Sequence, residues 1–131
     1  MLLVASGGAV GSVLRYLTSG ATHRWFAAAS GSATAFPVGT LFVNVSGSLL
    51  IGLFAGLAQS RALLGGDARL LLVVGVLGGY TTFSAFSLET LVLLRAGQPL
   101  TAFGSVLLQV VLGLAAAFAG YSAGLAAGRP V

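Results

Sequence analysis

Long apolar stretches, separated by short polar connections, occupy most of this 131-residue chain and leave few folds open to it. A helix needs about 20 mostly apolar residues to cross a bilayer. Four stretches meet this requirement, at about 2–22, 37–60, 70–94 and 100–127. Only 6% of the residues are charged, whereas soluble domains carry about a quarter. The chain is therefore predicted to be a single all-α transmembrane domain, residues 1–131, with four spans in the lipid bilayer.

The ends and connections of these spans agree with that prediction. The N-terminal stretch lacks the basic region of a cleaved signal peptide and continues into further apolar sequence, so we expect it to remain as the first span. The first connection carries HRWF at 23–26, whose aromatic rings suit a membrane interface. The next two connections, 61–69 and 95–99, hold charges and turn-forming residues.

Positive charge is sparse and evenly spread along the chain. The basic residues are Arg15, Arg24, Arg61, Arg69, Arg95 and Arg129. Because they do not cluster, they offer no basic face to nucleic acid. If Arg15 snorkels toward the side of Arg24 and Arg95, each side of the membrane carries three arginines. The positive-inside rule then favours neither orientation, which predicts dual insertion and an antiparallel homodimer; the alternative is a single orientation set by weaker cues.

Small residues recur at four-residue spacing in every predicted span. They are Gly7 and Gly11, then Ser48, Gly52 and Gly56, then Gly75 and Gly79, and finally Gly120, Gly124 and Gly128. Such ridges let helix backbones approach closely within lipid. Tightly packed helices of one copy enclose little space, so we expect a pathway for a solute to need a second copy.

An amide side chain lies in the middle of the second span. Thr40, Asn44 and Ser48 are four residues apart and share one helical face. An amide in hydrocarbon is costly unless it has a partner or faces a polar cavity. From this span alone, Asn44 could equally cross-link helices or line a pathway.

The segment GGYTTFSAFSLE, residues 78–89, predicts a break in the third span. Gly78 and Gly79, followed by Tyr80, Thr81 and Thr82, make a poor helix centre, since glycine and β-branched residues disfavour helix. Non-helical backbone at membrane depth is tolerated only when it is buried in protein or lines a cavity, and broken helices recur at ion sites. The alternative is a glycine-rich packing face whose hydroxyls bond to their own helix.

The polar groups of these two spans are uncharged, apart from Glu89 and Arg15 near predicted span ends. The side chains that could donate hydrogen bonds to an anion are Asn44, Thr82, Ser84 and Ser87. Phe83 and Phe86 could add the positive edges of their rings, or could simply pack or face lipid. Carbonyl groups freed at the break could instead hold a small cation.

Other functions require groups that this chain lacks or misplaces. There is no cysteine for a disulfide or a thiolate metal site. The single histidine and two acids do not form a set of nucleophile, base and orienting residue, so no enzyme is expected. A proton-coupled drug or cation antiporter would need a carboxylate in mid-span, whereas Glu89 lies beyond the predicted break. A further alternative is a helical subunit that transports nothing.

Three stretches together resemble one family, the Fluc (CrcB) fluoride channels of microbes. They are GGAVGSVLRY at 7–16, GTLFVNVSGSLLIG at 39–52 and GGYTTFSAFSLE at 78–89. The resemblance implies a passive, fluoride-selective channel in the inner membrane that exports fluoride from the cytoplasm. It also implies an antiparallel, dual-topology homodimer with two pores.

Site residues follow from the same resemblance. It implies that Gly78 and Thr81 bind a central sodium ion through backbone carbonyls. It also implies that Asn44 is the amide of the pore, and that the ring edges of Phe83 and Phe86 contact the fluoride ion. Arg15 matches a family position and is a candidate for the vestibule, although it could instead pair with an acid or a carbonyl.

The fourth span departs from the family pattern. The family's polar track there corresponds to Ser105, Gln109 and Gly113, and Gln109 is bulkier than the usual serine. Gln109 could line the pore or bridge two helices.

Overall fold

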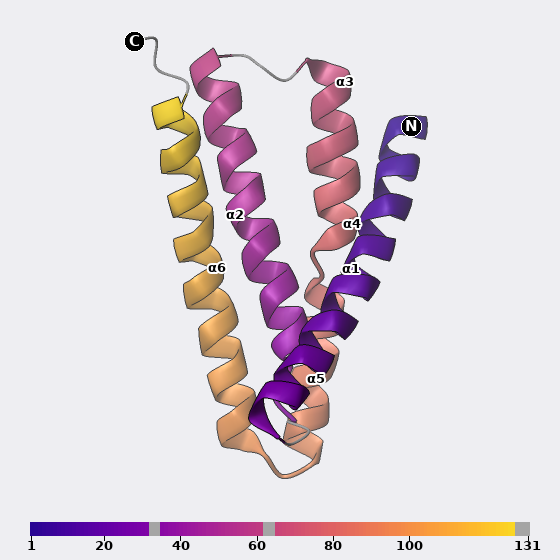
Figure 1. The fold of residues 1–131 in the computed structure, drawn as a ribbon, viewed down its shortest axis with the longest axis vertical. Helices are drawn as coiled ribbons and strands as arrows, with labels where there is room; N and C mark the ends of the chain where they lie inside the picture. Colours follow the sequence, from indigo (N-terminus) through magenta and orange to yellow (C-terminus); the bar gives the residue numbers. More distant parts are fainter. Residues whose placement is uncertain (32–34, 62–64, 128–131) are drawn as a thin grey trace.

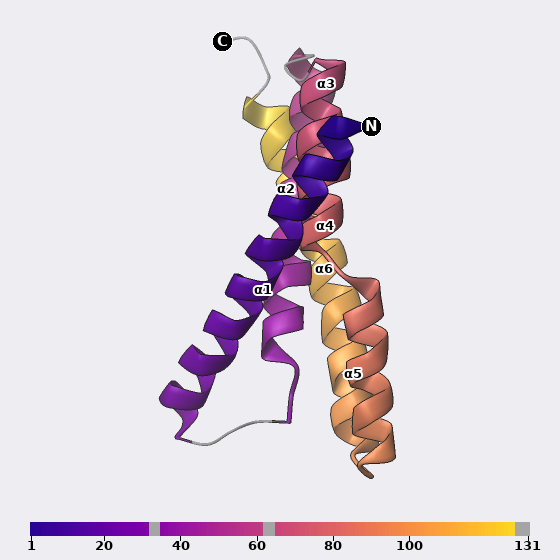
Figure 2. The same cartoon turned by 90° about the vertical axis from the view of Figure 1, so that its right-hand side faces the viewer.

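The computed structural model describes residues 1–31, 35–61 and 65–127, and over these the chain is all-helical. Its elements are α1 (Leu2–Ser30), α2 (Val38–Arg61), α3 (Gly66–Arg69), η1 (Leu70–Leu77), α4 (Gly78–Tyr80), α5 (Phe83–Arg95) and α6 (Pro99–Ala127). Figure 1 shows that α1 begins and α6 ends at the same end of the bundle. In Figure 2, α1 and α5 diverge toward the other end, so the bundle opens there.

Three helical segments are long and apolar enough to cross a membrane. Within the described residues these segments are Val38–Ser60, Gly66–Arg95 and Pro99–Ala127. They confirm the second, third and fourth predicted spans by length and composition. α1 has 29 residues, but its serine, threonine and arginine residues make it more polar than the others. The chain is accordingly a multi-pass membrane protein.

Two predicted boundaries were wrong. The first span was expected to end near residue 22, with 23–26 in a connection, but α1 continues to Ser30. Three alanines favour helix there, and the helix ends only where Gly31 takes a left-handed conformation with φ 69. The third span begins at Gly66 rather than 70, because Asp67 in the first turn and Arg69 in the last turn suit the ends of α3.

The turn between α5 and α6 follows the expectation from its sequence. Gly97 adopts φ 72, and the backbone amide of Gln98 donates to the carbonyl of Leu93 at 2.9 Å, closing the C-terminus of α5. Pro99 then begins α6, where its missing N–H costs no helical bond.

The predicted small-residue ridge of the first span packs α1 against η1 and α4. A Cβ atom on Gly7 would lie 2.5 Å from the carbonyl oxygen of Leu71, and one on Gly79 would lie 2.5 Å from that of Gly8. In the same way, a Cβ atom on Gly75 would lie 2.9 Å from the Cα of Gly7. Backbone therefore touches backbone along this interface, as the spacing predicted.

A second ridge joins α2 to α6 in the most extensive helix pair of the structure. A Cβ on Gly56 would lie 2.9 Å from the backbone nitrogen of Leu125, and one on Gly124 would lie 2.8 Å from that of Leu57. This confirms the predicted ridges of the second and fourth spans, although Gly128 lies outside the described residues.

The α2–α6 contact gives a test of the ridge. Gly120→Ala would place a Cβ 2.9 Å from the backbone nitrogen of Leu53 and in collision with the carbonyl oxygen of Leu49. We expect about 1–3 kcal/mol of destabilisation, typical of overpacking, measured by thermal unfolding in detergent. Gly104→Ala on the same helix is the control, because nothing lies within 4 Å of its new Cβ. Equal unfolding temperatures for the two variants would contradict this packing.

Candidate functional site

The third span breaks in the middle, as predicted, but later than its glycines suggested. Thr81 and Thr82 are extended, with φ/ψ of −75/156 and −151/116. Gly78 is helical, with φ −64 and ψ −36, and Gly79 belongs to α4. Gly79 allows the close approach to α1. The break begins at Thr81 and ends at Thr82, whose hydroxyl caps α5 by accepting from the amide of Ala85 at 3.2 Å.

The side chain of Asn44 clamps this break. The backbone amide of Thr82 donates to Asn44 Oδ1 at 2.9 Å, and Asn44 Nδ2 donates to the Thr82 carbonyl at 3.1 Å. Nδ2 also donates to Gln109 Oε1 at 2.7 Å. One half-buried amide thus joins α2, the broken segment and α6. An amide nitrogen carries two hydrogens, so both hydrogens of Asn44 bond within the chain.

The break also changes the partners of two backbone carbonyls. In a continuous helix, the carbonyls of Gly78 and Thr81 would accept from the amides of Thr82 and Ala85. Those amides instead donate to Asn44 Oδ1 and Thr82 Oγ1. Oxygen is the ligand that hard cations prefer. The two residues that the resemblance implies for sodium therefore fit that role by the chemistry of their freed carbonyls.

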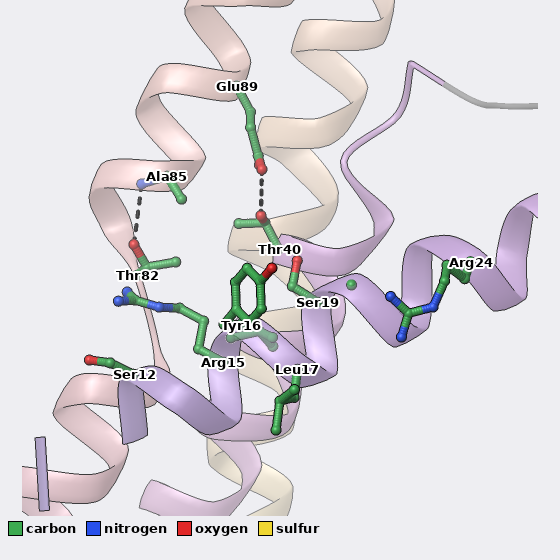
Figure 3. A pocket seen from close by; sticks show the side chains of 12 residues that line it. Ser12, Arg15, Tyr16, Leu17, Ser19, Arg24, Thr40, Thr82, Ala85 and Glu89 are labelled. Atoms are coloured by element: carbon green, nitrogen blue, oxygen red, sulfur yellow. Dashed lines mark hydrogen bonds between the residues drawn. The ribbon is translucent and has the colours of Figure 1, made fainter. Parts of the chain in front are cut away.

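A pocket of about 490 Å³ opens beside the break, between α1, α2 and α5 (Figure 3). Its lining residues are Ser12, Arg15, Tyr16, Leu17, Ser19, Gly20, Arg24, Thr40, Val43, Thr82, Ala85 and Glu89. We call it the vestibule pocket.

Charged groups reach this pocket from two sides. The side chain of Arg15 extends from α1 toward the start of α5, and Arg24 lies further along α1 (Figure 3). On the opposite wall, the hydroxyl of Thr40 donates to Glu89 Oε1 at 2.6 Å. Arg15 thus lines the same cavity as Arg24. The lining of the pocket includes two guanidinium groups and one carboxylate, a balance of charge that favours anions.

A smaller hollow of about 290 Å³ lies at the same break. It is lined by Asn44, Ser48, Ile51, Thr81, Thr82 and Phe83. Thr82, one partner of the Asn44 clamp, therefore borders both hollows.

The two phenylalanines at the start of α5 contact each other. Their ring centroids are 5.4 Å apart with an interplanar angle of 53°. Phe86 is half-buried, whereas Phe83 is 79% exposed in the single chain. Two hydroxyl groups share this turn: Ser84 Oγ lies 3.2 Å from Thr82 Oγ1, and Ser87 donates to the carbonyl of Phe83 at 2.9 Å. The Ser87 hydroxyl is thus bonded to its own helix.

The polar residues of the fourth span face inward on α6. Ser105 is 1% exposed and Gln109 is 8% exposed. The helix-bridging role left open for Gln109 is present, because its Oε1 accepts from Asn44. Among the described residues, Gln109 Nε2 is a buried side-chain atom without a hydrogen-bond partner, as is Glu89 Oε2.

Two contacts were not anticipated from the sequence. The Thr40–Glu89 bond joins residues 49 positions apart, and the spacing of Thr40 from Asn44 was the only signal that it faces the site. Ser46 Oγ and Tyr80 Oη lie 3.0 Å apart, next to the break. Neither partner could be chosen from local spacing.

Comparison with known proteins places the chain in a family. Residues 2–121 match the family model described as CrcB-like protein, Camphor Resistance (CrcB). A protein of Nitrobacter winogradskyi, named fluoride-specific ion channel FluC, is 49% identical over 92% of this chain and 90% of its own length. A protein of the same name from Rhizobium meliloti is 48% identical over 92% and 91%.

A third relative carries the same name. A fluoride-specific ion channel FluC of Thermus thermophilus is 52% identical over 94% of this chain and 93% of its own length. These names are those of channels, which confirms the expectation that the family is not one of enzymes. The resemblance noted at the three motifs thus extends over nearly the whole chain, and this chain belongs to the CrcB-like family, whose relatives include the fluoride-specific ion channels FluC.

Proposed function

We propose that this protein is a fluoride-selective channel that lets the ion leave the cytoplasm passively across the inner membrane. The observation that carries the proposal is the Asn44 clamp at the break of the third span. Uncharged polar groups of α2, the break and α6 converge there, and Thr82 of the clamp lines both hollows. The names of relatives at about half identity over nearly the full length support the choice of ion.

The pathway would begin in the vestibule pocket, where Arg15 and Arg24 attract the anion. Beyond it, neutral donors replace the hydration shell of the ion. The residues that we propose to border the pathway, as donors or by holding the break in place, are Thr82, Asn44, Ser84, Phe83, Phe86, Ser105 and Gln109. A small anion gains most from such close donors, because the Coulomb energy rises as the distance falls.

A second copy in inverted orientation would complete the pathway. Phe83 is 79% exposed in the single chain although it begins the helix that borders both hollows. The membrane segments bury only a small share of their residues within one copy. Both features support a second copy, and the balanced arginine distribution supports its inverted orientation. Each of two pores would then combine residues from both chains.

Sodium would lie at the centre of that dimer. The carbonyls of Gly78 and Thr81 have lost their helical donors, and Gly78 is exposed. Two copies would bring two carbonyls each, a set that suits a hard cation. The ion would offset the repulsion between anions in nearby pores and would hold the two breaks together.

Ion flux in liposomes tests the proposed function. Purified protein reconstituted into liposomes is expected to release fluoride far faster than chloride, without a pH or sodium gradient, as recorded with ion-selective electrodes. Equal leakage of the two halides would contradict selectivity. Flux that required a proton gradient would favour the antiporter, and a folded protein that released neither ion would favour a subunit that transports nothing.

A further inference from the structure

The one histidine of the chain, His23, takes no part in the Asn44 clamp or in the lining of the vestibule pocket. It is half-buried on α1. A Cβ atom on Gly39 would lie 2.6 Å from Cδ2 of the imidazole ring, so the ring packs against the first turn of α2. The same turn carries Thr40, whose hydroxyl donates to Glu89. Packing therefore holds His23 against the turn that positions this carboxylate.

A separate cavity of about 370 Å³ brings His23 and Glu89 together. Most of its lining is apolar and comes from α5 and the segment before α2. Among the described residues, the ionisable groups that line it are His23 and Glu89. Glu89 also lines the vestibule pocket, together with Arg15 and Arg24. The carboxylate is thus shared by two cavities, one lined by the histidine and the other by the arginines.

One oxygen of this carboxylate lacks a donor. Oε1 accepts from the hydroxyl of Thr40 at 2.6 Å (Figure 3), whereas Glu89 Oε2 is buried without a hydrogen-bond partner among the described residues. A buried acceptor that makes no hydrogen bond is costly. The imidazole of His23 interacts electrostatically with the carboxylate, and a protonated imidazole carries two N–H donors. The protonated ring therefore suits Oε2 in both charge and hydrogen bonding.

The other charged groups around this pair differ from histidine in their response to pH. Among the described residues, the remaining titratable groups that line the two cavities are Arg15, Tyr16 and Arg24. Arginine stays charged and tyrosine stays neutral at physiological pH. In α2 the charged residue is Arg61 at the far end, α6 has none, and Arg95 lines neither cavity. Protonation of Glu89 itself would change the net charge in the same direction as protonation of His23, so variants must separate the two.

We propose, on the basis of the proposed function, that His23 is a positioning residue whose imidazolium pairs with Glu89 and thereby sets the charge of the vestibule pocket. Histidine changes its charge between about pH 5 and pH 8. When the ring is neutral, the carboxylate offsets part of the attraction that the two arginines exert on an anion. When the ring is protonated, the carboxylate is compensated and the local anion concentration rises. Fluoride flux therefore increases by about twofold to fivefold as pH falls, the effect of one charge at a partly exposed site.

The pH profile of fluoride efflux tests this assignment in the full-length protein. Liposomes have the same pH inside and outside, from about pH 5 to pH 8, and efflux from protein-free liposomes is subtracted. His23→Gln, which is uncharged, should stay at the alkaline value of the unmodified protein, and His23→Lys, which is charged throughout, should stay at the acid value. Asp67→Asn, at the other end of the bundle (Figure 1), is the control and should keep the unmodified profile. A flat profile in the unmodified protein, or an unmodified profile in His23→Gln, would overturn the assignment.

A contact measurement tests the pair without relying on transport or on variants. The chain has one histidine and one glutamate, so a ¹⁵N label on the imidazole and a ¹³C label on the glutamate carboxyl define a single pair. In solid-state NMR of the liposomes, the imidazole nitrogens should dephase the Glu89 carboxyl signal, and more strongly at about pH 5 than at about pH 8. No dephasing at the acid pH would refute the pair. Absence of fluoride flux from the unmodified protein would instead refute the proposed function and leave the pair to be judged by this contact.

Discussion

Replacing Asn44 by alanine is expected to lower fluoride flux by about a hundredfold, equivalent to roughly 2.7 kcal/mol, and to destabilise the fold. The change leaves the amide and carbonyl of Thr82 and the Oε1 of Gln109 without their partner. Thr82 is only 8% exposed, so water reaches these groups poorly. Each unsatisfied buried group costs about 1–3 kcal/mol, and the hydrogen bond from Asn44 to Gln109 of α6 is lost.

Electrode-recorded efflux and thermal unfolding in detergent measure the two effects. Asn44→Asp provides a second variant in case alanine does not fold, because its carboxylate still accepts from the amide of Thr82 but donates nothing to Gln109. Thr22→Ala is the matched control, since the hydroxyl of Thr22 bonds only to the carbonyl of Thr18 on its own helix. Undiminished flux and an unchanged unfolding temperature in Asn44→Ala would remove Asn44 from both roles.

Forcing the chain into one orientation is expected to reduce fluoride flux in native membranes to background. The proposed dimer needs both orientations, and a balanced arginine distribution leaves insertion undecided. A triple variant moves positive charge to the side that holds both termini. It combines Gly65→Lys and Gly66→Lys with Arg95→Ser. The two glycines tolerate side chains, because nothing lies within 4 Å of a Cβ added at either. This variant should insert with its termini in the cytoplasm.

The opposite variant combines Arg69→Ser with Ala29→Lys and Ala96→Lys, two exposed positions at the other end of the bundle. Each variant alone should give background flux in membrane vesicles prepared without detergent, whereas co-expression should restore it. A single cysteine at Gln98 reports orientation by labelling, because the chain has no other cysteine.

Detergent provides the control for folding. Extraction removes the membrane that fixes orientation, so either variant should regain flux after it is purified and reconstituted alone. Full flux from a single-orientation variant in native vesicles would refute the antiparallel assembly, while leaving fluoride selectivity to be judged by the liposome assay.

Much of the fold was predictable because it depends on local composition. Apolar length identified the spans, and the spacing of Gly7 and Gly11 identified the face that packs on η1. The boundary near residue 22 was wrong because polarity does not end a helix: α1 continued until Gly31 offered a left-handed conformation. The break was found within a few residues, but Gly78 and Gly79 proved helical.

The amino-acid sequence by itself determined that this chain forms membrane helices, that their faces approach closely, and that one of them breaks among uncharged polar residues. Only the tertiary structure decided that Asn44 meets Thr82 and Gln109, which lie 38 and 65 positions away in the chain. An amide can give away just two hydrogens. Which donors are consumed within the protein, and which remain for an ion, depends on directions and distances that no local pattern records.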